Sequence, residues 1–98
     1  MPIVLSEYNI EEFILNPENY IEIPTAIPVK INTISNNLRY RILYDSLQDI
    51  LVVLFFDNDD VIVSHYIYEY RTNTLEIGGH RLLDEAKFND FCQELKYM

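Results

Sequence analysis

The stretch Ile50-Leu51-Val52-Val53-Leu54-Phe55-Phe56 is apolar at all seven of its positions. A strand that faces water on one side alternates apolar and polar residues, whereas this run offers no polar position to water. Turn-forming residues bound it on both sides, at Asp45–Asp49 and at Asp57–Asp60. The run therefore predicts the central strand of a sheet, buried on both of its faces.

Further strands are predicted on both sides of this run. Alternation of apolar and polar residues predicts strands over 29–33, 38–44 and 61–70, with shorter extended segments at 20–24 and 74–77. The connections are short, with Asn36-Asn37 as one tight turn, and Gly78-Gly79 is expected to end the last strand. Because a parallel pair needs a long crossover, neighbouring strands should be antiparallel.

A helix is predicted near the start of the chain, over residues 7–15. Ser6 can cap its first turn, and Pro17 should end it. The apolar residues lie three and four positions apart, as on one face of a helix. This stripe consists of Ile10, Phe13 and Ile14.

A second helix is predicted at the other end of the chain. Asp84 is its candidate cap, and Glu85 is an acid in the first turn, where the helix dipole favours an anion. Its apolar stripe comprises Phe88, Phe91, Cys92 and Leu95. The sequence thus predicts one α+β domain over residues 1–98, an antiparallel β meander of four to six strands flanked by an N-terminal and a C-terminal helix.

The composition indicates a cytoplasmic protein. Among the 98 residues there is one cysteine, Cys92, so an internal disulfide cannot form. The N-terminus lacks the basic start of a signal peptide. The longest apolar run has seven residues, far fewer than the roughly 20 that a membrane span needs.

The net charge is −9, from 16 acids and seven bases. Residues 1–29 hold five acids and no base, and residues 45–70 hold six acids and no base, whereas residues 30–44 hold three bases and no acid. Nucleic acid and anionic membranes require Lys and Arg, so neither is expected as a direct partner. The acidic stretches favour a basic protein partner instead.

Residues that could carry chemistry are few. His65, His80 and Cys92 share no metal-binding spacing, so we expect a half-buried structural histidine, a surface histidine and a core cysteine. The Asp57–Asp60 segment fails as an EF-hand loop, because the glycine and glutamate that such a loop requires are absent. No nucleophile elbow or phosphate loop occurs. We therefore expect no catalytic residue, metal or cofactor.

The strand over 61–70 is rich in tyrosine. Alternation predicts that Tyr66, Tyr68 and Tyr70 share a face with Ile62 and Ser64. Aligned tyrosines are typical of binding surfaces, but they also cover sheets as ordinary strand formers. In addition, Arg39 and Arg41 on a nearby strand could stack on these rings.

Two functions from different classes fit these features. The first is a stoichiometric inhibitor of a basic, nucleic-acid-handling target such as a nuclease, of the anti-CRISPR or toxin-immunity type. DNA carries one charge per ~1.7 Å, so nine net charges imitate only ~15 Å of duplex, and occlusion of a basic groove is the better mechanism. The expected partner-binding residues are Glu7, Glu11, Glu12, Asp57, Asp59, Asp60, Tyr66, Tyr68 and Tyr70.

The second function is a homo-oligomeric structural or regulatory protein, in which a second copy, as in a homodimer, covers the central strand. A small-ligand-binding domain is a third class, for which the sequence offers no feature of its own.

Overall fold

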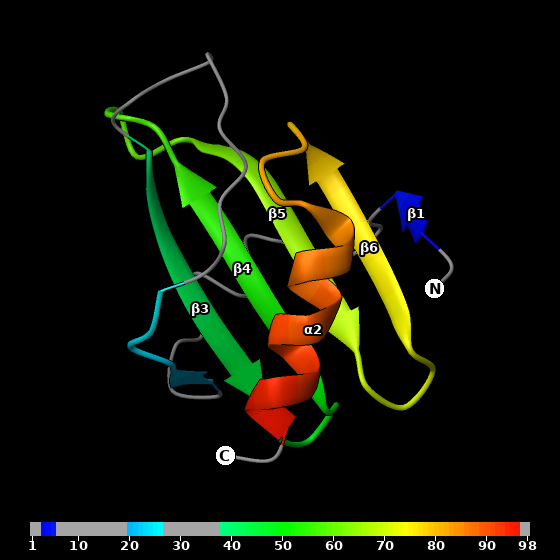
Figure 1. Ribbon diagram of the computed structural model, residues 1–98. Coiled ribbons are helices and arrows are strands. Elements are labelled where there is room, and N and C mark those ends of the chain that lie inside the picture. Colours follow the sequence, from blue (N-terminus) through cyan, green and yellow to red (C-terminus); the bar gives the residue numbers. More distant parts are fainter. Residues whose placement is uncertain (1–2, 6–19, 27–37, 97–98) are drawn as a thin grey trace.

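The computed structural model describes residues 3–5, 20–26 and 38–96 (Figure 1). Its elements, in chain order, are strands β1 (Ile3–Leu5), β2 (Ile21–Glu22), β3 (Arg39–Asp45), β4 (Ile50–Phe56), β5 (Ile62–Glu69) and β6 (Thr74–Gly79), followed by helix α2 (Glu85–Lys96). The predicted helix over 7–15 and the predicted strand over 29–33 lie outside the described residues.

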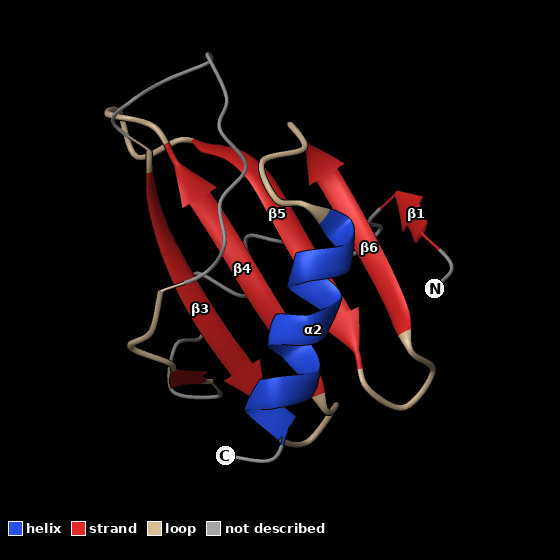
Figure 2. Ribbon diagram, viewed as in Figure 1, coloured by secondary structure: helices blue, strands red, loops and turns tan. Residues whose placement is uncertain are grey.

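The strands form one sheet in the order β1-β6-β5-β4-β3-β2 (Figure 2). All neighbours from β2 to β6 are antiparallel, which confirms the predicted meander. Strand β1 joins the outer edge in parallel with β6 and was not predicted. Three residues without an alternating pattern carry no strand signal, and their strand conformation depends on pairing with β6.

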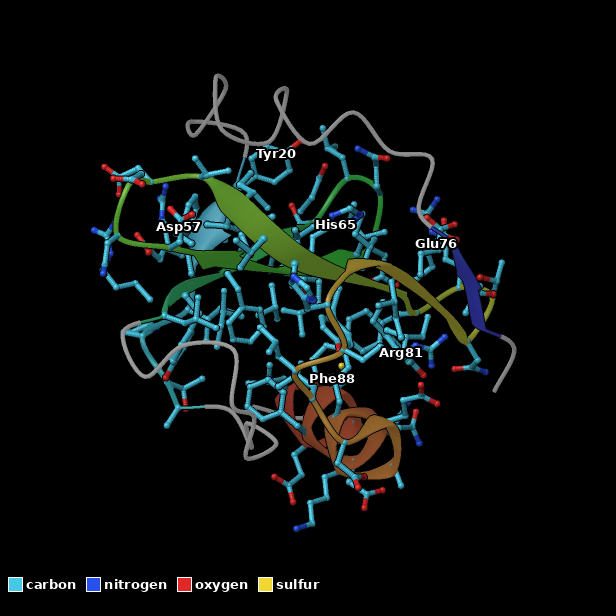
Figure 3. The ribbon with its side chains drawn as sticks, turned by 90° about the horizontal axis from the view of Figure 1, so that it is seen from above. Tyr20, Asp57, His65, Glu76, Arg81 and Phe88 are labelled. Carbon is cyan, nitrogen blue, oxygen red and sulfur yellow. The ribbon has the colours of Figure 1, made fainter. Side chains whose placement is uncertain are left out.

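Strand β4 is the central strand that its apolar run predicts. Leu51, Val53 and Phe55 belong to the core cluster under α2, and each is at most 1% exposed. The alternate side chains point to the opposite face, where they form a second buried cluster with Leu43 and Ile67. These alternate residues are Ile50, Val52 and Leu54. Helix α2 lies on only one side of the sheet (Figure 3).

Helix α2 follows its sequence signals closely. The side-chain Oδ1 of Asp84 accepts a hydrogen bond from the Lys87 N–H at 3.0 Å, which is the predicted N-cap contact. Phe88 and Cys92 are fully buried, while Phe91 and Leu95 pack at the margin of the core. The predicted stripe therefore faces the sheet.

Two predicted details of the sheet are wrong. Strand β6 does not stop before Gly78-Gly79 but runs through both glycines, because Gly78 and Gly79 pair with His65 and Ser64 of β5. Ile62 does not share the tyrosine face, since the register between β4 and β5 shifts next to Phe56. One extra residue in a strand reverses the alternation beyond it, and Ile62 consequently packs against the second cluster.

Candidate functional site

The tyrosine face is a core face, which corrects the expectation of an exposed binding surface. Tyr66, Tyr68 and Tyr70 are 0%, 1% and 6% exposed. The Tyr66 ring meets the Phe88 ring of α2 edge to face, with centroids 5.5 Å apart. These three tyrosines therefore cannot anchor a partner while α2 is docked.

The hydroxyl groups of the same tyrosines hold the C-terminal segment in place. Their contacts are the Leu83 N–H to Tyr66 (3.1 Å), the Gln93 Nε2 to Tyr68 (2.8 Å), and Tyr70 to the Cys92 carbonyl (2.9 Å). Burial raises the pKa of all three hydroxyls. The tyrosine face, which looks like a binding surface in the sequence, is thus the surface on which helix α2 docks.

The predicted acidic residues fall into two groups. Glu7, Glu11 and Glu12 lie outside the described residues. The other three, Asp57, Asp59 and Asp60, all lie in the turn that joins β4 to β5. We call residues 57–61 the acidic turn.

Asp57 organises the acidic turn from within. Its Oδ1 accepts hydrogen bonds from the backbone N–H groups of Asp59 (2.8 Å) and Val61 (3.0 Å). The Asp57 backbone also bonds to Val61 and to Asp60. Asp60 adopts a positive φ of 61°, a conformation that Asp tolerates better than most residues. The Asp57 carboxylate therefore shapes the turn from inside it.

The remaining side chains of the acidic turn are available at the surface. Asp59 and Asp60 are exposed, and the apolar Val61 beside them is 55% exposed. Asp60 forms an ion pair with Arg39, whereas Asp59 forms none with any residue that the structure describes. The turn thus presents carboxylates and one apolar side chain together.

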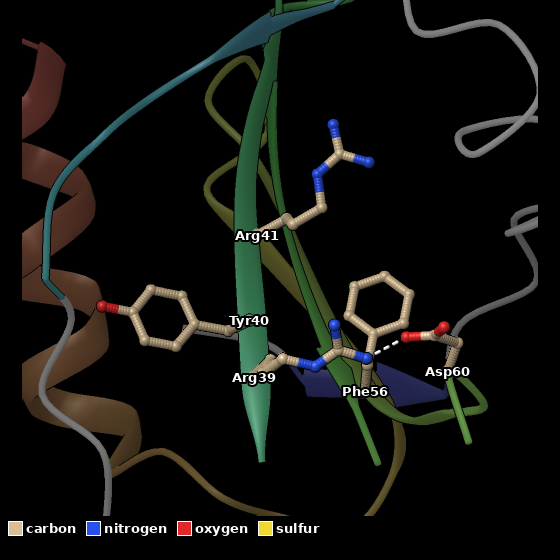
Figure 4. Close-up of a pocket in the computed structure, with 5 residues that line it drawn as sticks. All are labelled: Arg39, Tyr40, Arg41, Phe56 and Asp60. Carbon is tan, nitrogen blue, oxygen red and sulfur yellow. Dashed lines mark hydrogen bonds and ion pairs between the residues drawn. The ribbon is translucent and has the colours of Figure 1, made fainter. Parts of the chain in front are cut away.

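A pocket of about 460 Å³ adjoins the acidic turn (Figure 4). Of the described residues, those that line it are Arg39, Tyr40, Arg41, Phe56 and Asp60. The two arginines project from one side of β3, and the Tyr40 ring points to the other side, where it meets Phe55 (Figure 4). This corrects the suggestion that the arginines stack on the tyrosine face, because the sheet separates the two groups.

Each pocket arginine has an acidic partner. Arg39 pairs with Asp60, and Arg41 pairs with Glu22 of β2 through Nε (3.0 Å) and Nη2 (3.4 Å). Sequence reasoning missed Phe56 as a site residue, since the register that sets it opposite Arg39 is not visible in the sequence. The nearest signal was the basic stretch that contains both arginines.

The histidines and the cysteine lie where their sequence context predicts. His65 is half-buried in β5; its Nε2 has no hydrogen-bond partner in the described part of the chain, and burial lowers its pKa. His80 is exposed after β6, and Cys92 is buried in the core. Among residues 3–5, 20–26 and 38–96, no three His, Cys, Asp or Glu side chains gather as a metal site would require.

Comparisons with protein-family models, with curated proteins and with solved structures returned no match. Within the described residues, no helix has the length and apolar character that crossing a membrane requires.

Proposed function

We propose that this chain is a non-catalytic protein-binding module that inhibits a basic, nucleic-acid-handling target, as anti-CRISPR and toxin-immunity proteins do. The observation that carries the proposal is the acidic turn, an internally bonded hairpin connection whose Asp59 and Asp60 carboxylates are exposed. Asp57 fixes the backbone of the turn before any partner arrives. A partner then gains contacts without ordering the turn first, which strengthens binding.

The net charge supports the same kind of partner. With −9 on 98 residues, the molecule attracts a cationic surface from a distance and accelerates the encounter. At contact, the carboxylates of the acidic turn meet Lys and Arg of the target, and Val61 supplies an apolar contact next to them. Occlusion of a nucleic-acid-binding groove follows from this contact.

Fewer of the expected residues support the proposed docking surface within the described part of the chain. Of the nine expected partner-binding residues, the three tyrosines are buried and three glutamates lie outside the described residues, which leaves Asp57, Asp59 and Asp60. Asp57 is engaged inside the turn, so among the described candidates Asp59 and Asp60 are the ones proposed to reach a partner.

No observation favours the homo-oligomeric alternative. That alternative requires a second copy to cover the central strand. Ile50, Val52 and Leu54 are 0% exposed in the single chain, on the face opposite α2. A second copy is therefore not needed to bury that face.

The proposal is tested by affinity capture from the cell that expresses this chain, at about 50 mM and about 500 mM salt. We expect one protein with a pI above about 9, held at a one-to-one ratio, retained at low salt and largely lost at high salt. Its activity on nucleic acid should fall stoichiometrically as the chain is added. An acidic partner, or full activity at saturating binding, would contradict the proposal.

A further inference from the structure

The pocket beside the acidic turn combines hydrogen-bond donors with an aromatic ring. Arg39 and Arg41 are two positions apart on β3, so their side chains leave the same face of the strand (Figure 4). Phe56 of β4 lies directly opposite Arg39 in the register and provides an apolar wall. A volume of about 460 Å³ falls within the range of small-molecule sites.

The two guanidinium groups retain donors beyond their ion pairs. Arg39 uses Nη2, which contacts the Asp60 carboxylate and the Asp57 carbonyl, and Arg41 uses Nε and Nη2 toward Glu22. A guanidinium group has five N–H donors. In the part of the chain that the structure describes, Nε and Nη1 of Arg39 and Nη1 of Arg41 make no hydrogen bond. These donors suit a planar, acceptor-bearing ligand.

The resident acids are displaceable. The side chains of Arg39 and Asp60 are 62% and 75% exposed, and those of Arg41 and Glu22 are 39% and 54% exposed. Ion pairs in such exposed settings are weak, because water and salt screen them. A ligand carboxylate can therefore take the place of Asp60 at Arg39.

We propose that this pocket binds planar aromatic carboxylates, with the ligand ring against Phe56 and the ligand carboxylate on the forks of Arg39 and Arg41. Guanidinium groups match a carboxylate in two-pronged geometry. A cation would meet two resident positive charges, and a phosphate dianion would suffer more repulsion from Glu22 and the acidic turn than a monoanion does. The site goes beyond the protein-docking function and does not depend on it.

The test is a titration of the whole protein with benzoate at constant ionic strength, followed through backbone amide NMR signals. We expect saturable shifts confined to residues 39–41, 56 and 60. Cyclohexanecarboxylate, which has the charge without the flat ring, should bind more weakly, and benzylammonium should leave these signals unmoved. Non-saturating shifts, or equal binding of all three compounds, would overturn the proposal.

Matched variants separate displacement of Asp60 from general charge effects. Asp60→Asn removes the competitor at Arg39 and should tighten benzoate binding by up to about fivefold, the worth of an exposed ion pair. Asp59→Asn makes the same charge change at the neighbouring residue and should have little effect on the affinity for benzoate. Arg39→Gln and Arg41→Gln should each abolish the shifts, whereas Arg71→Gln should not. Equal tightening by the two asparagine variants would refute displacement of Asp60.

Discussion

At the scale of single residues, the His65 ring packs closely over Gly78. The two residues are register partners on β5 and β6, and a Cβ added to Gly78 would collide with the imidazole ring of His65. Gly78 interrupts the strand pattern in the sequence, and its lack of a side chain leaves room for the neighbouring His65 ring.

We expect Gly78→Ala to reduce the free energy of unfolding by about 1–3 kcal/mol, because the imidazole must move out of a packed position. Urea unfolding measures the change. The same substitution in a His65→Ala background should cost much less, since the obstructing ring is gone. An equal loss in both backgrounds would show that the ring contact is not the cause.

His65 should also make stability depend on pH. Burial lowers its pKa below the ordinary 6.5, so in the interval between the folded and unfolded values the unfolded chain binds more protons. Stability should therefore decline as the pH falls through 6.5 and should stop declining, for this residue, below the folded pKa. Urea unfolding across this range is expected to show a shallower slope for His65→Gln than for the wild type.

The exposed His80 provides the matched control for this pH dependence. His80→Gln should retain the wild-type slope. If both substitutions change the slope equally, the half-buried position of His65 is not what couples protonation to folding.

At the scale of elements, helix α2 docks on the tyrosine face of the sheet. Phe88 is 0% exposed and its ring meets Tyr66, whereas Phe91 lies at the margin of the core. We expect Phe88→Ala to cost about 3–5 kcal/mol and Phe91→Ala clearly less. Chemical denaturation of the two variants measures both values, and a larger loss for Phe91→Ala would contradict this docking.

The elements that could be predicted are those with a local signal. The uninterrupted apolar run predicts β4, the apolar stripe with helical spacing predicts α2, and Asp84 marks the start of the helix. The faces could not be assigned in the same way, because alternation groups Tyr66, Tyr68 and Tyr70 without saying which side α2 covers. The bulge next to Phe56 and the parallel pairing of Ile3–Leu5 depend on partners distant in sequence.

The candidate site was predictable only in part, for the same reason. Asp57, Asp59 and Asp60 lie within four consecutive residues and were expected together in one turn. The pocket joins Arg39 and Arg41 to Phe56 and Asp60, which lie on other elements. Their proximity follows from the pairing of β3 with β4, and a register of this kind has no signature in one sequence.

At the scale of the whole molecule, helix α2 and the acidic turn occupy different parts of the sheet. Helix α2 packs on the tyrosine face of the sheet, and the acidic turn lies at one end of the β4–β5 hairpin (Figure 1). The described ion pairs neutralise Asp60, Glu22 and Glu85 in part, while Asp59 has no such pair within residues 3–5, 20–26 and 38–96. Within the acidic turn, Asp59 is therefore the carboxylate that we propose contacts a partner most directly.

The account is tested most directly by the affinity of charge-reversed variants for the captured basic partner, measured by calorimetry at fixed ionic strength. Asp59→Lys should weaken binding by tenfold or more (about 1.4 kcal/mol or more), as expected when a like charge is placed at an interface. Asp90→Lys, the same change at an exposed position of α2, should weaken it far less. Equal weakening by the two variants, or unchanged affinity of Asp59→Lys, would contradict docking through the acidic turn.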